Sequence, residues 1–585
     1  MKRFITFFLF GLMLMVSGCS QMDSSAKLHT LFDEAWNFQL QENPLFATSV
    51  GHHESNDRLP SMTLPDLERR VEFWRDVLNR LHTLDRSGLG ETDRINYDIF
   101  EYQVKDNIAN FEFKAYTMPF TAESGFHTGF ARLPNRVPLA TVQDYENYIK
   151  RLHAWPDYVH QQIALIKEGI SIGMTQPKVV LAGFEITMKT HVVDDPAKSV
   201  FYKPFERFPA TITKEEQIRL LDAGRSAITE AVVPGYRDLL SFFVNEYVPN
   251  ARESIGASHL PNGRKYYEQR VQYYTTLDMG LEEIHELGLK EVARIRKEMD
   301  EIIKEVGFTG DFAGFLHFLR TAPQFYAKTP QELLKEASYI AKKIDGKLPS
   351  LFKTLPRLPY GVAPVPAHIA PKYTTGRYVG PALGSTEPGY YWVNTYALES
   401  RPLYNLESLT LHEAVPGHHL QNAIARELTN LPNFRRFSYI SAFGEGWGLY
   451  CEWLGLEAGF YTDPYSNFGR LTYEMWRACR LVVDTGMHAL GWTRQQTLDY
   501  LASNTALPLH EIKTETDRYI SWPGQALSYK IGELKIKALR RKAEEILGKN
   551  FDIREFHDVI LRNGSVPLKV LEELVGDWIE EKRAG

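Results

Sequence analysis

Residues 411–421 read Leu-His-Glu-Ala-Val-Pro-Gly-His-His-Leu-Gln and concentrate three histidines and a carboxylate. In the zinc motif H-E-x-x-H, two histidines one helical turn apart bind the metal, and the glutamate acts as a general base. His412 and Glu413 match the first half of this motif, but Pro416 stands where the second histidine belongs. The sequence therefore predicts a zinc site only if the chain between the two histidine positions is rearranged.

Two adjacent histidines compete for the role of second metal ligand. On a straight helix His419 lies within about 20° of the His412 face but ~10.5 Å further along the axis, whereas His418 is about 120° off that face. Pro416 lacks a backbone donor and clashes with the preceding turn, so we expect a kink or bulge there. A bulge that moves His418 back toward His412 makes it the preferred ligand. His419 is then an outer partner or the alternative ligand.

The glycine-rich segment Ser-Ala-Phe-Gly-Glu-Gly-Trp-Gly at residues 441–448 offers a third ligand, Glu445. The sequence separation from His418 allows one helix to end and another to return, and glycines on both sides of Glu445 permit close backbone approach. Two turns later Glu452 lies on the same face and is predicted to orient a histidine through its second ring nitrogen. The predicted ligands are His412, His418 or His419, and Glu445, with Glu413 as the base that activates a zinc-bound water.

Apolar residues at helical spacing predict a mainly α-helical protein. The helices that position the motif residues are expected at 404–415, from 417 to about 429, at 441–458, at 465–490 and in a final group at 527–582. Residues 356–388 are instead rich in Pro, Gly, Tyr and Thr, and residues 364–395 are predicted to form a small sheet or hairpin directly before the motif helix. An unpaired edge strand there would hold an extended peptide through backbone hydrogen bonds.

Composition places the chain among ordinary globular proteins, with 44% apolar and 24% charged residues. The net charge of −6, with both signs interspersed, gives no case for nucleic acid binding. Since no composition break separates independent domains, residues 19–585 are expected to form one bilobed unit whose metal-site half begins near residue 356. Cys451 and Cys479 are expected to be buried thiols on helices.

The first 18 residues have the features of a lipoprotein signal peptide. Lys2 and Arg3 precede an apolar run at residues 4–16 that is too short for an ordinary spanning helix. The run ends in Val-Ser-Gly followed by Cys19, which resembles a bacterial lipobox and implies a lipid on that cysteine. Ser20 resembles the pattern sorted to the outer membrane. The implied location is the cell envelope, facing the periplasm, with the lipid as the only membrane contact.

The motif residues together resemble the bacterial domain-of-unknown-function 885 family, which is grouped with zincin metallopeptidases whose third ligand is a glutamate. The likeness rests on residues 412–421 and 445–447, extends to 484–488 and 522–532, and is weaker at 141–177. It implies a large bilobed helical zincin-like fold with a deep central cleft, one zinc ion and hydrolysis of peptide bonds.

The C-terminal segment is more distantly similar to that of helical dipeptidyl carboxypeptidases and thermostable carboxypeptidases, in which a tyrosine helps to stabilise the tetrahedral oxyanion. By this likeness Tyr529 is the first candidate for the oxyanion donor and Tyr519 the second, each with packing as the alternative. Gln525 stands where the carboxypeptidases have their catalytic tyrosine. Weaker candidates are His488 oriented by Asp484 for catalysis, and Arg518 or Lys530 for holding a substrate carboxylate.

The sequence thus predicts an envelope-anchored zinc peptidase, carboxypeptidase- or dipeptidase-like, with a peptide as substrate and Glu413 as general base. Two alternatives stay open. One is a non-catalytic lipoprotein that binds a peptide or partner at a degenerate zinc site, and the other is a zinc amidase that acts on cell-wall peptides. Zinc content and peptide turnover separate the first alternative from the enzyme.

Overall fold

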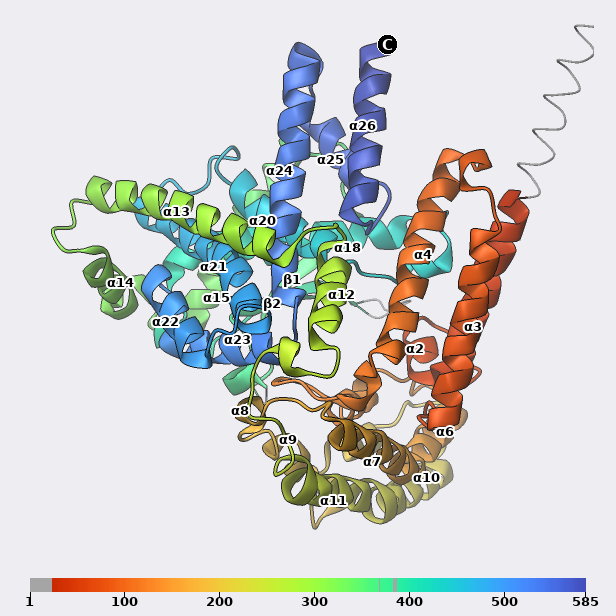
Figure 1. The fold of residues 1–585 in the computed structure, drawn as a ribbon. Helices are drawn as coiled ribbons and strands as arrows, with labels where there is room; N and C mark the ends of the chain where they lie inside the picture. The colour runs from red at the N-terminus through yellow and green to blue at the C-terminus, as the bar shows by residue number, and fades with distance from the viewer. Residues whose placement is uncertain (1–23, 368, 382–386, 585) are drawn as a thin grey trace, which may run out of the picture. The chain divides into compact units, whose positions relative to one another are not determined.

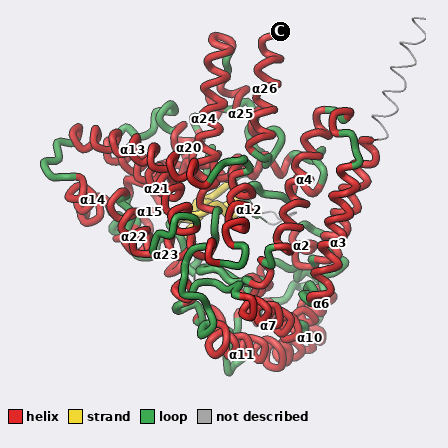
Figure 2. The backbone as a smooth tube through the Cα atoms, viewed as in Figure 1, coloured by secondary structure: helices red, strands yellow, loops and turns green. Residues whose placement is uncertain are grey.

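The computed structural model describes residues 24–367, 369–381 and 387–584, so the signal peptide and Cys19 lie outside the described residues. Helices dominate the described part, and its strands form one small sheet (Figures 1 and 2). The prediction of a mainly α-helical fold is confirmed. Among the helices described, none has the length and apolar character needed to cross a membrane.

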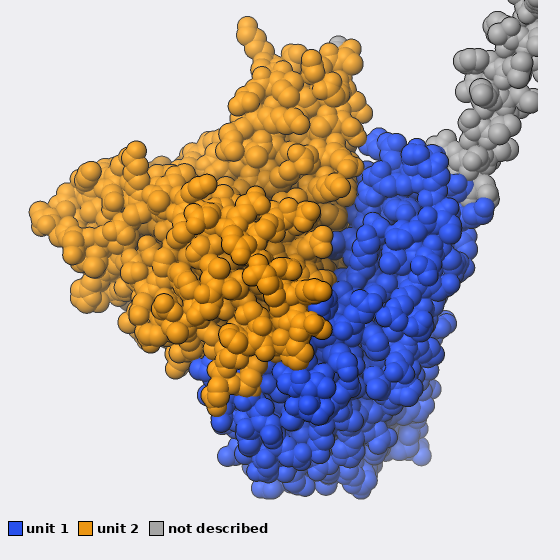
Figure 3. Space-filling view, in the orientation of Figure 1, with its two compact units in different colours: residues 1–251, 431–437 blue, residues 252–430, 438–585 orange. Residues whose placement is uncertain are grey.

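The chain divides into two compact units, which Figure 3 colours separately. Unit 1 comprises the residues up to Ala251 together with Leu431–Phe437, and unit 2 comprises Arg252–Asn430 and Ser438–Gly585. Every predicted site residue belongs to unit 2, which begins well before the expected boundary near residue 356. The deep central cleft stays a prediction.

Unit 1 is built from helices and the loops that join them. Its helices start at side-chain caps where the sequence offers them: Thr63 accepts from the N–H of Asp66, and Thr141 forms a reciprocal capping box with Asp144. Residues 24–42 are also helical. The remaining α-helices are α2 (Pro44–Ser49), α3 (Leu64–His82), α4 (Glu91–Glu112), α5 (Phe126–Phe130), α6 (Val142–His153), α7 (Trp155–Ile172), α8 (Lys178–Leu181), α9 (Ile186–Lys189), α10 (Lys214–Ala227), α11 (Val233–Phe242) and α19 (Asn433–Arg436).

Unit 2 is organised around α21 (Pro464–His488), which is buried along almost its whole length, and around α13 (Leu281–Glu305), which packs along it. The apolar face of α13 follows the helical repeat, as its sequence predicts. Cys451 and Cys479 are buried free thiols, also as predicted. The α-helices of unit 2 are α12 (Gly263–Thr275), α13 (Leu281–Glu305), α14 (Phe312–Thr321), α15 (Pro330–Asp345), α16 (Leu348–Leu351), α17 (Leu406–Glu413), α18 (His418–Glu427), α20 (Ser441–Leu454), α21 (Pro464–His488), α22 (Arg494–Asn504), α23 (Leu509–Ser521), α24 (Ser528–Leu547), α25 (Ile553–Leu561) and α26 (Leu568–Ala584).

The sheet lies against the helix that carries His412. It consists of β1 (Tyr360–Pro364), β2 (Gly376–Val379) and β3 (Gly389–Val393) in the order β1-β3-β2, with β1 parallel and β2 antiparallel to β3. Tyr391 on β3 is fully buried, and its hydroxyl accepts a hydrogen bond from Thr410 on α17 at 3.4 Å. The predicted β element is present, and β2 is an edge strand of it.

Lys530 is buried in a network of ion pairs that joins three helices. Its ammonium lies 3.0 Å from Glu291 on α13, 2.8 Å from Glu474 on α21 and 2.6 Å from Glu533 on its own helix α24. Its side chain is 0% exposed, and the three carboxylates raise its pKa against the effect of burial. The prediction that Lys530 holds a substrate carboxylate is therefore wrong, because protein carboxylates already occupy it.

Replacing Lys530 with Met is expected to destabilise the protein by about 3–5 kcal/mol, since it leaves buried carboxylates without their cation. Equilibrium urea denaturation measures the change. Lys342→Met is the control, because the side chain of Lys342 is 84% exposed and forms a surface ion pair with the nearby Asp345. A Lys530 variant as stable as the control would contradict a structural role for the network.

Candidate metal centre

The predicted rearrangement around Pro416 takes the form of a complete break between two helices. α17 ends at Glu413 and α18 begins at His418, with four residues, 414–417, outside both helices. Trp447 holds this segment by donating its indole N–H to the carbonyl of Pro416 at 2.8 Å. A Cβ on Gly417 would lie 1.9 Å from the carbonyl oxygen of His412, so only glycine fits the turn.

This break brings His418 to His412, and α20 adds Glu445. Glu445 Oε2 lies 3.6 Å from His412 Nε2 and 3.4 Å from His418 Nε2. One ligand atom from each of the three residues falls within 4.8 Å of the others. These are three of the four residues that the sequence offered as metal ligands.

Neighbouring side chains fix the orientation of two of these residues. Glu452, two helical turns beyond Glu445 on α20, receives the Nδ1–H of His412 at 2.8 Å and leaves Nε2 directed at the group. The hydroxyl of Tyr439 donates to Glu445 Oε1 at 3.0 Å, so the carboxylate presents its other oxygen to the histidines. Gly448 makes room for the imidazole, because a Cβ there would lie 2.6 Å from His412 Cε1.

Burial and charge act in opposite directions on this group. Burial lowers the pKa of His412, but Glu445 and Glu452 more than reverse this and raise it to about 10. Burial raises the pKa of Glu445, and His412 and His418 outweigh it, so its pKa lies well below the usual range. The carboxylate is therefore ionised at neutral pH, and the group combines a negative oxygen with two imidazole nitrogens, which is a common donor set for zinc.

Glu413 stands next to the group without joining it. Its Oε2 accepts the backbone N–H of Tyr378 on the edge strand β2 at 2.8 Å. The side chain is half-buried, so it keeps access to solvent. This hydrogen bond ties the predicted general base to the sheet, and it places an edge strand beside the predicted reacting centre.

His419 points away from the metal-ligand group. Its Nε2 hydrogen-bonds to the carbonyl of Leu358 at 3.1 Å, and its ring packs against Tyr360 and Tyr378. Burial lowers its pKa to about 4. Of the two adjacent histidines, His418 therefore faces His412 and His419 faces the sheet.

The two tyrosine candidates differ in their surroundings. The Tyr529 ring lies 6.5 Å from the His412 ring, and its hydroxyl oxygen accepts from Arg518 at 3.4 Å. No described residue accepts a hydrogen bond from that hydroxyl. The Tyr519 hydroxyl instead accepts from Trp476 and Arg480, each at 2.8 Å, and its side chain is buried. Tyr529 therefore keeps its candidacy as a donor, and Tyr519 has the contacts of a packing residue.

The proposed pairing of His488 with Asp484 is absent. His488 accepts the N–H of Ala257 at Nδ1 and hydrogen-bonds to the carbonyl of Tyr519 through Nε2. Asp484 instead accepts from Tyr267 and from the backbone of Gly524. Both ring nitrogens of the buried His488 are thus satisfied by backbone groups, which rules out the predicted catalytic role.

Two residues at the site were missed in the sequence, Tyr439 and Arg377. Tyr439 precedes α20, and no motif spacing marks it as a partner of Glu445. Arg377 lies on β2 directly before Tyr378. The surrounding protein lowers the pKa of Arg377 by removing hydration, but the charges of Tyr373, Glu413, Tyr529 and Glu445 outweigh this and raise it. Strand assignment alone gave no sign that this arginine lies near residues far along the chain.

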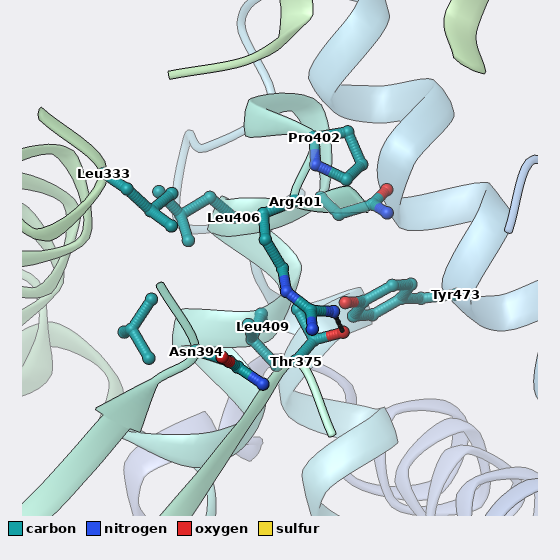
Figure 4. Close-up of a pocket in the computed structure, with 10 residues that line it drawn as sticks. Leu333, Thr375, Asn394, Arg401, Pro402, Leu406, Leu409 and Tyr473 are labelled. Atoms are coloured by element: carbon teal, nitrogen blue, oxygen red, sulfur yellow. Dashed lines mark hydrogen bonds between the residues drawn. The ribbon is translucent and has the colours of Figure 1, made fainter. Parts of the chain in front are cut away.

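A small cavity beside α17 is a packing feature separate from this group. Its volume is about 10 Å³, room for one water at most. Arg401 crosses it and donates to Thr375 Oγ1 at 3.2 Å (Figure 4). The lining residues are Leu333, Thr375, Val393, Asn394, Arg401, Pro402, Asn405, Leu406, Leu409 and Tyr473, and none of them is a predicted site residue.

Replacing Glu452 with Gln is expected to weaken zinc binding about 10- to 100-fold, because the negative charge that orients His412 is lost. Competition with a fluorescent zinc chelator measures the affinity. Glu457→Gln is the matched control, since Glu457 pairs with Arg540 and has no contact with the ligand residues. Equal zinc affinity in the two variants would show that Glu452 does not support the site.

The fold and site define a mainly helical protein with a two-histidine, one-glutamate group between a broken helix and a glycine-rich helix. The chain belongs to the family described as "Bacterial protein of unknown function (DUF885)", whose model matches residues 44–575. No curated protein matches.

Solved structures similar to this chain include two that are described as putative lipoproteins. The one from Colwellia psychrerythraea is 28% identical with a TM-score of 0.88, covering 95% of this chain and 99% of its own. The one from Shewanella oneidensis is 18% identical with a TM-score of 0.70, covering 94% of this chain and 99% of its own, and shows the fold alone. The description of the Colwellia psychrerythraea structure is consistent with a lipid-anchored envelope protein.

Proposed function

We propose that this protein is a zinc-dependent peptidase. The observation that carries the proposal is the convergence of His412 Nε2, His418 Nε2 and Glu445 Oε2 beside Glu413. Two histidines and a glutamate leave one position of a tetrahedral zinc open, as catalytic sites require. Such a site differs from a closed structural one, in which protein atoms fill all four positions.

The distances from the Glu445 oxygen to the two histidine nitrogens fit zinc. Tetrahedral ligands at 2.0–2.1 Å from a common centre are about 3.3–3.4 Å apart. The distances from Glu445 Oε2 to the two histidine nitrogens are 3.4 and 3.6 Å. The Glu452 contact to His412 Nδ1 supports the same reading, because ligand histidines commonly donate their other N–H to a carboxylate.

The chain's own residues supply the remaining parts of a hydrolytic mechanism. A bound zinc ion would contribute Lewis acidity and lower the pKa of a water. Glu413, held by the Tyr378 N–H, accepts the proton of the attacking water and passes it to the leaving amine. The Tyr529 hydroxyl, whose oxygen accepts from Arg518, is free to donate to the oxyanion that forms on the peptide carbonyl.

The cellular setting is part of the proposal. The lipobox-like sequence ending at Cys19 supports lipid attachment, and Ser20 supports sorting to the outer membrane. The lipoprotein descriptions of the two solved structures point the same way. The peptidase domain would then act on peptides in the periplasm.

The test is hydrolysis of a mixed peptide library by the purified mature chain, followed by mass spectrometry. Zinc-loaded protein is expected to cleave a subset of the peptides. Removing the metal with a chelator should stop cleavage, and adding zinc back should restore it. Peptide binding without any cleavage by stoichiometrically zinc-loaded protein would overturn the proposal in favour of a non-catalytic binding protein.

A further inference from the structure

We propose that Arg377 binds an anionic group of the substrate and so directs the site toward peptides with a carboxylate near the scissile bond. This inference rests on the proposed peptidase function and names its substrate class. A peptide carries such a carboxylate either at its C-terminus or on an Asp or Glu side chain. The shared chemistry is a guanidinium–carboxylate pair, which binds through two parallel hydrogen bonds.

The position of Arg377 on the edge strand places it at the site. The next residue, Tyr378, donates its backbone N–H to the proposed base Glu413 at 2.8 Å. β2 pairs with β3 on one side only, so its other edge faces Glu413. A substrate whose scissile bond lies beside Glu413 therefore passes within one residue of Arg377.

The guanidinium of Arg377 has no acceptor within the described part of the chain. The side chain is exposed to solvent, and no described residue forms a hydrogen bond or an ion pair with it. This contrasts with the other arginines around Tyr529. Arg480 is bonded to Tyr519 and Glu515, and Arg518 to Glu515 and Gln525.

The negative charges of Glu413 and Glu445 act on the Arg377 guanidinium, although neither carboxylate forms an ion pair with it. Protein around the side chain removes part of its hydration, which lowers its pKa, and the charges of Glu413 and Glu445 help to raise it. Zinc bound at Glu445 would neutralise part of that negative charge. The guanidinium would then be an exposed cation beside the reacting centre, available to a substrate carboxylate.

Binding of simple zinc-directed probes tests the inference without requiring a known substrate. The probes are hydroxamates that end in a carboxylate two, three or four methylenes away, each paired with the carboxamide of equal length. Zinc-loaded wild type is expected to bind at least one carboxylate about tenfold or more tightly than its amide, as measured by calorimetry. Arg377→Met should remove this preference and leave amide binding, zinc content and thermal stability unchanged, while Arg377→Lys should retain part of it.

Arg583→Met is the control for a general loss of positive charge, because Arg583 lies near the end of α26 and pairs with Glu580. If both hydroxamate series bind zinc-loaded wild type equally, the role of Arg377 is wrong while the metal site stands. If neither series binds, the zinc site is wrong and the inference falls with it. Loss of zinc or of folding in Arg377→Met would assign the residue a structural role and also overturn the inference.

The source of the carboxylate is then read from peptides bound to zinc-loaded Glu413→Gln protein. One pair compares benzoyl-Gly-Ala-Ala with its C-terminal amide. The other compares benzoyl-Gly-Glu-Ala-amide with the corresponding Gln peptide. An Arg377-dependent preference in the first pair indicates the C-terminal carboxylate, and one in the second indicates an acidic side chain. No Arg377-dependent preference in either pair contradicts the inference.

Discussion

Replacing Glu413 with Gln is expected to lower peptide hydrolysis by about 100- to 10,000-fold while zinc stays bound. The amide oxygen of the variant still accepts the N–H of Tyr378, so the local structure is kept. The amide cannot take a proton from the attacking water, however, and the reaction loses its general base. Steady-state kcat/KM on a peptide found in the library assay, together with the zinc content of each preparation, measures both parts of the prediction.

Glu407→Gln provides the matched control for this change. Glu407 lies on the same helix and accepts the backbone N–H of Tyr461 at 3.2 Å, without contact to the metal-ligand group. It should keep both zinc and activity. A Glu413→Gln variant that retained full activity would exclude the glutamate as general base, and one that lost its zinc would make it a ligand.

Separate alanine substitutions of the two adjacent histidines are expected to differ in zinc binding, which His418→Ala should lose and His419→Ala should keep. His418→Ala removes a proposed ligand atom. Zinc affinity should therefore fall by more than the about 10- to 100-fold that is typical when a residue orienting a ligand is replaced. His419→Ala removes a ring that bonds to Leu358 and packs on the sheet, so it should lower stability and retain zinc. Zinc stoichiometry after dialysis against a weak chelator, with thermal denaturation alongside, distinguishes the two results.

The opposite pattern, with zinc kept in His418→Ala and lost in His419→Ala, would reverse the assignment of the second ligand. Loss of zinc in both variants accompanied by unfolding would show only that α18 had been disrupted. His418→Gln and His419→Gln, which keep more of the side-chain volume, then decide between the two positions. In that pair the folded His419→Gln protein is expected to bind zinc and the folded His418→Gln protein to lose it.

Helical periodicity, together with the Pro and Gly residues that interrupt it, predicted much of the fold. α17, α18, α20 and α21 appear close to their expected positions, and the aromatic segment before the motif forms the sheet. α23 (Leu509–Ser521) was not anticipated as a separate element. Pro416 indicated a break in the motif helix, but the size of the break depends on Trp447 and on the fit of Gly417, which are tertiary contacts.

The candidate site, too, depends on tertiary contacts that the sequence pattern does not reveal. His412, Glu413 and Glu445 could be named from type and spacing, because one helix supplies the first two residues and another returns with the third. The sequence favoured His418 over His419 but left the choice open, since the residues that hold His419, Leu358 and Tyr360, come from a distant part of the sequence. The structural role of Lys530 could not be predicted from the sequence either, because it follows from the burial of the side chain and from carboxylate partners on three helices.

The most direct test of the central claim is the location of zinc in crystals of the zinc-loaded protein, found by anomalous diffraction at the zinc absorption edge. We expect one ion within about 2.0–2.2 Å of His412 Nε2, His418 Nε2 and Glu445 Oε2. Glu413 should lie close to the open coordination position without binding the ion. An ordered group that takes up no zinc, or an ion bound through His419, would contradict the proposed site.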